Sequence, residues 1–219
     1  MIFVRIESTW GLEKKMEQSE SDIDVRHAEK MAVRKIARDQ ILSEKIIEKG
    51  LLIVHTGAGK GKSTAAFGMM MRAIGHGFRV AMVQFVKGQR DSGERSVLDK
   101  FPDLVDVLAI GEGFTWETQD RQRDIASARA GWKKTQEILA DASYRLVVLD
   151  ELNIVLRYGY LPIQEILEGL SCRAPHCHVV VTGRNALPEL IAAADLVTEM
   201  TLIKHPFRSG VKAQPGVDF

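Results

Sequence analysis

The sequence is poor in cysteine and in net charge, and it has no long apolar run. Only Cys172 and Cys177 are cysteines. A secreted protein of this size would more often carry a disulfide framework, so we expect a cytoplasmic location. Lys plus Arg number 30 and Asp plus Glu number 29, which gives a net charge of +1. This balance provides no strong field to recruit nucleic acid. No apolar run reaches the length of a membrane span, and residues 1–15 lack the order of a signal peptide, so no membrane partner is expected.

What the sequence does contain is a 219-residue chain with 45% apolar residues, enough for one domain with a real core. Short runs rich in Val, Ile and Leu predict strands that lack clean polar alternation, as expected when both faces of a sheet are covered. These runs are 51–55, 80–86, 105–110, 146–149, 178–182 and 196–202. Helix-length segments separate them, most clearly 62–74 and 118–140. The alternation predicts an α/β fold: a mostly parallel sheet of about six strands with helices on both faces.

The amino-terminal part has a different pattern. Residues 1–23 are polar and irregular, and we expect them to be disordered or to be an extension from a start codon assigned too early. Apolar residues at spacings of three or four predict an amphipathic helix over 24–49, ended by Gly50. Whether this helix packs on its own sheet or has a further use stays open. The remaining segment, 50–219, is expected to form one domain.

A glycine-rich segment, TGAGKGKST at 56–64, lies between a predicted strand and a predicted helix. Gly61, Lys62 and Ser63 fit the end of the phosphate-binding Walker motif, whereas Thr56 stands where the first glycine is usual. Glycines let backbone N–H groups point at phosphate oxygens, and the helix that follows adds positive charge at its start. The pattern predicts a P-loop NTPase-like fold whose ATP-binding residues are Gly57, Ala58, Gly59, Lys60, Gly61, Lys62, Ser63 and Thr64.

Two acidic residues, Asp150 and Glu151, follow the predicted buried strand 146–149. In P-loop proteins such a strand end lies beside the phosphate loop, where an acid holds Mg²⁺ directly or through water. We therefore predict that Ser63, Asp150 and Glu151 hold a magnesium ion. The alternative is an ordinary helix cap at the end of a strand.

Several longer segments complete the pattern. They are GKGKSTAAFG at 59–68, VQFVKG at 83–88, GFTWETQ at 113–119, LDEL at 149–152, YGYLP at 158–162, TGR at 182–184, AD at 194–195, KHPF at 204–207 and GVKAQ at 210–214. Together they resemble the P-loop-type ATP:cob(I)alamin adenosyltransferases, from about His27 to the carboxyl terminus. Thr56 is usual in that family. Two positions depart from its pattern: Ala58 replaces the usual Asn or Lys of the loop, and Pro215 is unusual in the tail.

The resemblance implies transfer of the 5′-deoxyadenosyl group of ATP to Co(I) of a reduced corrinoid, with release of triphosphate. Because Co(I) is the nucleophile, no protein nucleophile is needed. The resemblance assigns catalysis to Lys62, Glu151 and Arg184, with Arg184 also binding ATP. It assigns corrinoid binding to Phe114 and Trp116, as an apolar wall that excludes water and the lower axial ligand; ordinary packing is the alternative for this pair. It further implies Mg²⁺, a homodimer, an electron-donating reductase or flavin, and an amino-terminal helix that closes over a nucleotide site.

Two other functions fit the phosphate loop. A Mg-dependent P-loop ATPase or small-molecule kinase would release ADP, and a nucleotide-responsive binding module would bind ATP without turnover. The aromatic segment 113–119 and the tail segments favour the transferase over both. Cys172, His176, Cys177 and His178 lie close together in the sequence, but their spacing matches no zinc pattern.

Overall fold

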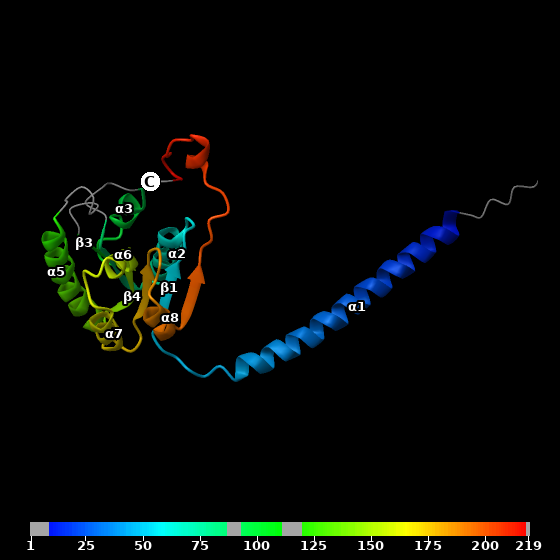
Figure 1. Ribbon diagram of the computed structural model, residues 1–219. Coiled ribbons are helices and arrows are strands. Elements are labelled where there is room, and N and C mark those ends of the chain that lie inside the picture. Colours follow the sequence, from blue (N-terminus) through cyan, green and yellow to red (C-terminus); the bar gives the residue numbers. More distant parts are fainter. Residues whose placement is uncertain (1–8, 87–92, 111–119, 218–219) are drawn as a thin grey trace, which may run out of the picture. The chain divides into compact units, whose positions relative to one another are not determined.

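The computed structural model describes residues 9–86, 93–110 and 120–217, and for residues 9–21 it describes the backbone alone. The chain divides into two compact units, Met1–Glu48 and Lys49–Phe219. Unit 1 contains one helix, and unit 2 contains the sheet and the remaining helices (Figure 1). Among the described residues, none of the helices combines the length and apolar character that crossing a bilayer requires.

Helix α1 of unit 1, Thr9–Ser43, differs from the expected range of 24–49 at both ends. No Gly or Pro occurs between Leu12 and Lys49, so nothing in the sequence breaks the helix on the amino-terminal side of Asp24. The helix ends well before Gly50, where the hydroxyl of Ser43 donates to the backbone oxygen of Gln40 at 2.7 Å.

Unit 2 is built on six strands, and all five pairings between them are parallel. The strands are β1 (Leu52–Thr56), β2 (Arg79–Gln84), β3 (Val105–Ala109), β4 (Tyr144–Asp150), β5 (His178–Thr182) and β6 (Leu196–Glu199). Their order across the sheet is β3-β2-β4-β5-β1-β6. The predicted α/β fold with a parallel sheet of about six strands is confirmed. Strand β6 is shorter than expected because the chain leaves the sheet after Glu199 and passes against the glycine-rich loop.

Helices cover both faces of this sheet (Figure 1). They are α2 (Lys62–Gly75), α3 (Gly93–Leu98), α5 (Arg121–Ala140), α6 (Leu152–Arg157), α7 (Ile163–Ser171) and α8 (Pro188–Ala193), and a 3₁₀ helix, η1, follows at Pro206–Ser209. Successive strand residues point to opposite faces. Val148 of β4 therefore packs with α2 and α3, whereas Val147 and Leu149 pack with α5 to α8. This double coverage explains why the strands read as continuous apolar runs.

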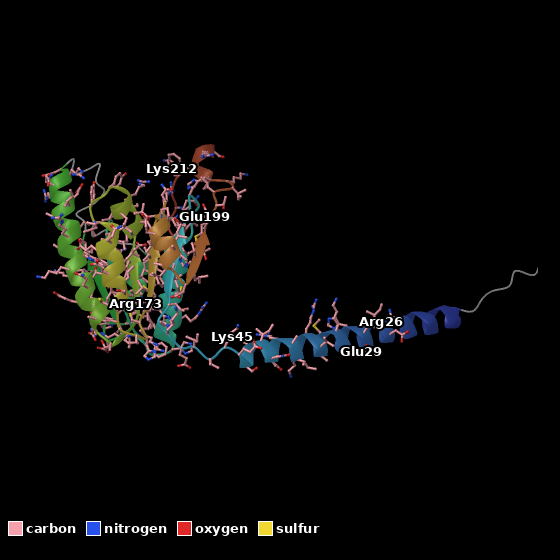
Figure 2. All side chains as sticks on the ribbon, turned by 60° about the horizontal axis from the view of Figure 1, so that its bottom comes forward. Arg26, Glu29, Lys45, Arg173, Glu199 and Lys212 are labelled. Carbon is pink, nitrogen blue, oxygen red and sulfur yellow. The ribbon has the colours of Figure 1, made fainter. Side chains whose placement is uncertain are left out.

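Because all strands run the same way, the sheet has one edge of amino ends and one edge of carboxyl ends. Figure 2 labels Arg173, just before β5, at the first edge and Glu199, the last residue of β6, at the second. Arg173 fixes the first edge by donating to the backbone oxygens of Gly50 (2.8 Å), Leu170 (2.7 Å) and Cys177 (3.3 Å). The glycine-rich loop and the Asp150–Glu151 pair lie at the second edge, where ligands bind in open parallel sheets.

Candidate active site

The glycine-rich loop joins the end of β1 to the start of α2. Gly57 has φ 96° and Gly61 has φ 106°, values in the left-handed region that side-chain-bearing residues rarely adopt. Gly61 is also the residue that caps α2, and as glycine it has no side chain with which to cap the first amide groups of this helix. The first turn of α2 is therefore suited to accept an anion on its N–H groups.

The loop also packs tightly against the segment that follows β6. A Cβ atom on Gly57 would lie 2.5 Å from the backbone oxygen of Met200, and one on Gly59 would lie 2.7 Å from the same oxygen. The amide of Gly59 donates to that oxygen at 2.6 Å, and the amide of Met200 donates to Thr56 O at 2.8 Å. Packing against Met200 thus demands glycine at 57 and 59 independently of phosphate, and the Gly59 amide, expected to face phosphate, is already paired.

Lys62, the first residue of α2, is buried although it carries a charge. Its Nζ donates to the backbone oxygens of Gly57 (2.9 Å) and Gly59, which hold the ammonium group over the loop. Burial lowers the pKa of Lys62 from its ordinary value, the carboxylate of Glu151 opposes that effect, and Arg184 adds to it. The structure therefore brings Lys62, Glu151 and Arg184 within electrostatic reach of one another, as the sequence-based site requires.

Asp150, the last residue of β4, is 1% exposed and lies next to the loop. The hydroxyl of Ser63 donates to its Oδ1 at 2.7 Å, and the hydroxyl of Thr182 donates to the same oxygen at 2.8 Å. Among the described residues, no side chain or backbone group hydrogen-bonds its buried Oδ2. A buried carboxylate oxygen without a donor is costly, and a cation is the ligand that relieves the cost.

Glu151, the residue after β4, has an unusual backbone conformation. Its φ is 62°, in the left-handed region, where a non-glycine residue costs about 1–2 kcal/mol. Its amide donates to Oγ1 of Thr182 at 3.0 Å, which helps to hold that conformation. Strained residues of this kind concentrate at functional sites, because the surrounding structure must hold them in place.

Thr182 was not assigned a role from the sequence, although it belongs to the TGR segment at the end of β5. Its side chain is fully buried and links Asp150 to Glu151. Gly183 follows with φ 124°, and a Cβ atom there would lie 2.8 Å from the Cβ of Asn153. Asn153, also unassigned from the sequence, donates from Nδ2 to Gly183 O at 3.0 Å. The turn after β5 therefore fits closely around the acidic pair and leads to the exposed Arg184.

For the remaining expected site residues, the structure provides less information about a role in binding. Ala58, Lys60 and Thr64 are exposed on the loop and the first turn of α2. The two residues expected to bind the corrinoid, Phe114 and Trp116, lie outside the described residues.

The oxygen atoms of Ser63, Asp150 and Glu151 fit a magnesium site by their chemistry. Mg²⁺ prefers hard oxygen ligands, keeps several waters, and is usually held by one or two carboxylates together with substrate phosphates. The unpaired Oδ2 of Asp150 matches this requirement. Within the described part of the chain, no cluster of three or more His, Cys, Asp and Glu side chains offers a metal site built from protein ligands alone.

One family model and several similar proteins carry the description of corrinoid adenosyltransferase. The family model for ATP:corrinoid adenosyltransferase BtuR/CobO/CobP matches residues 48–219. A corrinoid adenosyltransferase of Sinorhizobium sp is 56% identical over 198 residues, which cover 90% of this chain and 92% of that protein. One of Pseudomonas aeruginosa is 53% identical over 196 residues, 90% of this chain and 97% of that protein. Corrinoid adenosyltransferase CobA of Salmonella typhimurium is 42% identical over 196 residues, 90% and 99% of the two chains.

Proposed function

We propose how this chain, which belongs to the ATP:corrinoid adenosyltransferase family and transfers the adenosyl group of ATP to a corrinoid, binds its nucleotide. The glycine-rich loop, Asp150–Glu151 and Arg184 bind the triphosphate of ATP. The observation that carries the proposal is the convergence of these groups at the carboxyl edge of the sheet. Ser63 hydrogen-bonds Asp150, and Lys62 lies within electrostatic reach of both Glu151 and Arg184.

For this reaction, the site must stabilise the triphosphate as it leaves the ribose. The nucleophile is Co(I), which attacks the 5′-carbon of the ribose, so the bond from that carbon to the triphosphate oxygen breaks as the cobalt–carbon bond forms. Charge then accumulates on the triphosphate. Lys62, Arg184 and the amide groups at the start of α2 are the cationic and dipolar groups that stabilise it.

We propose Ser63, Asp150 and Glu151 as the residues that hold Mg²⁺ together with the triphosphate. When bound, the ion supplies Lewis-acid stabilisation of phosphate oxygens. Thr182 donates to Oδ1 of Asp150 and accepts the backbone amide hydrogen of Glu151. Its hydroxyl thereby leaves Oδ2 of Asp150 to face the ligand and holds the backbone of Glu151 in place.

The corrinoid side of the site stays a prediction. Phe114 and Trp116 are proposed to form an apolar wall that removes water and the lower axial ligand from cobalt. Loss of that donor eases the reduction of Co(II) to Co(I). An electron-donating reductase or flavin is the partner that this step requires.

Further proposals concern the cellular location of the enzyme, its oligomeric state and its amino-terminal helix. The absence of a disulfide between the free thiols Cys172 and Cys177 supports a cytoplasmic location. A homodimer is supported by Leu196 and Val197 of the edge strand β6, which are 49% and 37% exposed in a single chain. That the amino-terminal helix closes over a nucleotide site stays a prediction, as does the division of the chain into extension, helix and catalytic domain.

One experiment separates the proposal from its alternatives. The protein is incubated with ATP, Mg²⁺ and chemically reduced cobalamin, and the phosphate product is identified by ion-exchange chromatography. Triphosphate formed in step with adenosylcobalamin supports the proposal. ADP as the product would show an ATPase or kinase, and bound ATP without turnover would show a binding module. The Arg184→Ala variant tests the proposed ATP site itself, because the loss of this guanidinium group should slow the transfer.

A further inference from the structure

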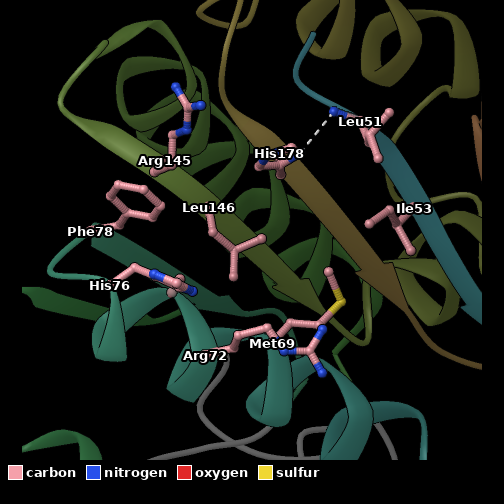
Figure 3. A pocket seen from close by; sticks show the side chains of 10 residues that line it. Leu51, Ile53, Met69, Arg72, His76, Phe78, Arg145, Leu146 and His178 are labelled. Atoms are coloured by element: carbon pink, nitrogen blue, oxygen red, sulfur yellow. Dashed lines mark hydrogen bonds between the residues drawn. The ribbon is translucent and has the colours of Figure 1, made fainter. Parts of the chain in front are cut away.

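A second cavity lies at the opposite edge of the sheet from the phosphate loop. It has a volume of about 260 Å³ and is formed by the amino ends of β1, β4 and β5 together with the last turns of α2 (Figure 3). Its lining residues are Leu51, Ile53, Met69, Arg72, Ala73, His76, Phe78, Arg145, Leu146 and His178. None of them has a role in the proposed transfer reaction.

The inner part of this cavity is apolar. Ile53 and Leu146, each 3% exposed, belong to the core between the sheet and α2, and Leu51 and Met69 pack against that core. Phe78 closes one side and is 42% exposed. Cavities of about 150 Å³ hold a benzene ring, so this space accommodates one aromatic or branched aliphatic group.

The polar part of the lining is cationic. Arg72 and Arg145 contribute two guanidinium groups, His76 and His178 contribute two imidazoles, and among the described lining residues none is acidic. The guanidinium carbon of Arg145 lies 5.6 Å from the ring centroid of Phe78, and the His76 ring stacks on the same ring at 5.9 Å. These contacts place positive charge beside an aromatic surface, and planar guanidinium groups match the geometry of carboxylates.

His178 adds a neutral hydrogen-bond donor to this lining. Its Nδ1 accepts the amide hydrogen of Leu51 at 3.1 Å, which leaves the ring proton on Nε2 (Figure 3). Burial lowers the pKa of His178, and the charges of Arg145, Arg173 and His176 lower it further. Burial is the larger cause, and the neighbouring arginines Arg145 and Arg173 place positive charge at this end of the sheet, which favours an anion.

The end of α2 does not oppose an anion as strongly as a bare helix terminus would. The backbone oxygen of Ala73 accepts from the amides of His76 and Phe78, both at 3.0 Å, and the oxygen of Ile74 accepts from Gly77 at 2.8 Å. These bonds occupy carbonyl groups that would otherwise present partial negative charge to the cavity.

We propose that this cavity binds a small organic carboxylate whose single aromatic or branched aliphatic group occupies the apolar part. The carboxylate pairs with Arg145, whose guanidinium group lies beside Phe78, whereas Arg72 lies on the opposite side of the cavity (Figure 3). A neutral apolar ligand would contact only the apolar part of the cavity and would leave the guanidinium group of Arg145 without a carboxylate partner.

The test uses phenylacetate as the probe and its neutral amide, phenylacetamide, as the matched ligand. The full-length protein is saturated with MgATP so that the phosphate loop is occupied, and binding is followed by chemical shifts of backbone amides. We expect phenylacetate to shift the amides of Leu51, Phe78 and Leu146 and to bind at least about tenfold more tightly than phenylacetamide, because charge-assisted hydrogen bonds separate the two.

Substitutions then identify the guanidinium group that binds the carboxylate. Arg145→Gln should weaken phenylacetate binding about tenfold or more and leave phenylacetamide unaffected, whereas Arg72→Gln, on the opposite side of the cavity, should have a much smaller effect. Arg129→Gln, at an exposed position on α5, is the matched control and should bind as the parent does. The thermal midpoint and the rate of adenosyl transfer should be preserved in all three. Equal binding of acid and amide, shifts confined to the phosphate loop, or unchanged phenylacetate affinity in Arg145→Gln would each overturn the proposal.

Discussion

The hydroxyl of Thr182, at the end of β5, donates a hydrogen bond of 2.8 Å to Oδ1 of Asp150, at the end of β4. Both side chains are buried, at 0% and 1% exposure. Since β4 and β5 are neighbours in the sheet, the bond locks together two strand ends that frame the proposed metal site. The same hydroxyl accepts the amide hydrogen of Glu151, so one side chain orients the carboxylate of Asp150 and holds the backbone of Glu151.

Removing this hydroxyl is expected to impair both stability and metal binding. Thr182→Val keeps the side-chain shape but leaves buried polar groups unpaired, which should lower the free energy of unfolding by about 1–3 kcal/mol. It should also raise the Mg²⁺ concentration needed for half-maximal transfer. Thr182→Ser retains the hydroxyl and is the control. Thermal unfolding and Mg²⁺ titration of the rate check both effects, and a valine variant equal to the serine variant would exclude the positioning role.

Lys62→Ala should abolish transfer and weaken ATP binding. In the proposed site the buried ammonium group makes a charge-assisted contact to phosphate worth about 1.5–3 kcal/mol, which corresponds to roughly tenfold to a hundredfold in affinity. Titration calorimetry with ATP measures the change. Lys133→Ala, an exposed lysine on α5, is the matched control. Unchanged ATP affinity in Lys62→Ala would mean that the phosphate loop is not the ATP site.

Gly59→Ala should damage the loop through packing. The added methyl carbon would lie 2.7 Å from the backbone oxygens of Met200 and Thr201, both of which are backbone atoms that cannot rotate away. We expect weaker ATP binding and a lower thermal midpoint. Gly68→Ala in α2 is the contrasting variant, because no atom lies within 4 Å of the new carbon. Alanine in a helix interior should stabilise the protein by about 0.5–1 kcal/mol, and equal effects of the two substitutions would contradict the packing argument.

Trp116→Ala separates nucleotide binding from corrinoid chemistry. Because Trp116 carries no charge and is distant from the loop in sequence, MgATP should bind normally. The loss should appear in the reduction of enzyme-bound Co(II), and pre-formed Co(I) should restore much of the rate. The absorption spectrum of bound Co(II)alamin with ATP reports whether the axial ligand has left. Identical spectra for parent and variant would show that this residue does not form the proposed wall.

The two thiols should differ in reactivity. Cys177 is 1% exposed, and burial raises its pKa to about 11, so its thiol stays protonated at pH 8. Cys172 is exposed. We expect iodoacetamide at pH 8 to modify Cys172 in the native protein and both thiols after denaturation, as read by mass spectrometry. The Cys172→Ser variant should resist modification until it unfolds, and rapid labelling of that variant in the native state would contradict the burial of Cys177.

The sequence by itself determined the sheet and predicted the residues at the centre of the proposed site. Continuous apolar runs predicted all six strands because a sheet covered on both faces buries every residue of a strand. The spacing of glycines before Lys62 and Ser63 predicted the phosphate loop, since that backbone path and that helix start leave few other residue choices. Asp150 and Glu151 could be predicted because a buried strand ends in them.

Only the tertiary structure decided what surrounds these residues. The pairing of Thr182 with Asp150, and the contact of Gly59 with Met200, join segments that are 32 and 141 positions apart. The cationic cavity likewise combines β1, α2, β4 and β5, whose lining residues form no motif in the sequence. The limits of α1 differed from the expected range: no glycine or proline between Leu12 and Asp24 interrupts the helix, so it begins earlier, and it ends at Ser43 instead of at Gly50. Local sequence patterns encode burial and turns, whereas contacts between distant strand ends depend on which strands are neighbours in the folded sheet.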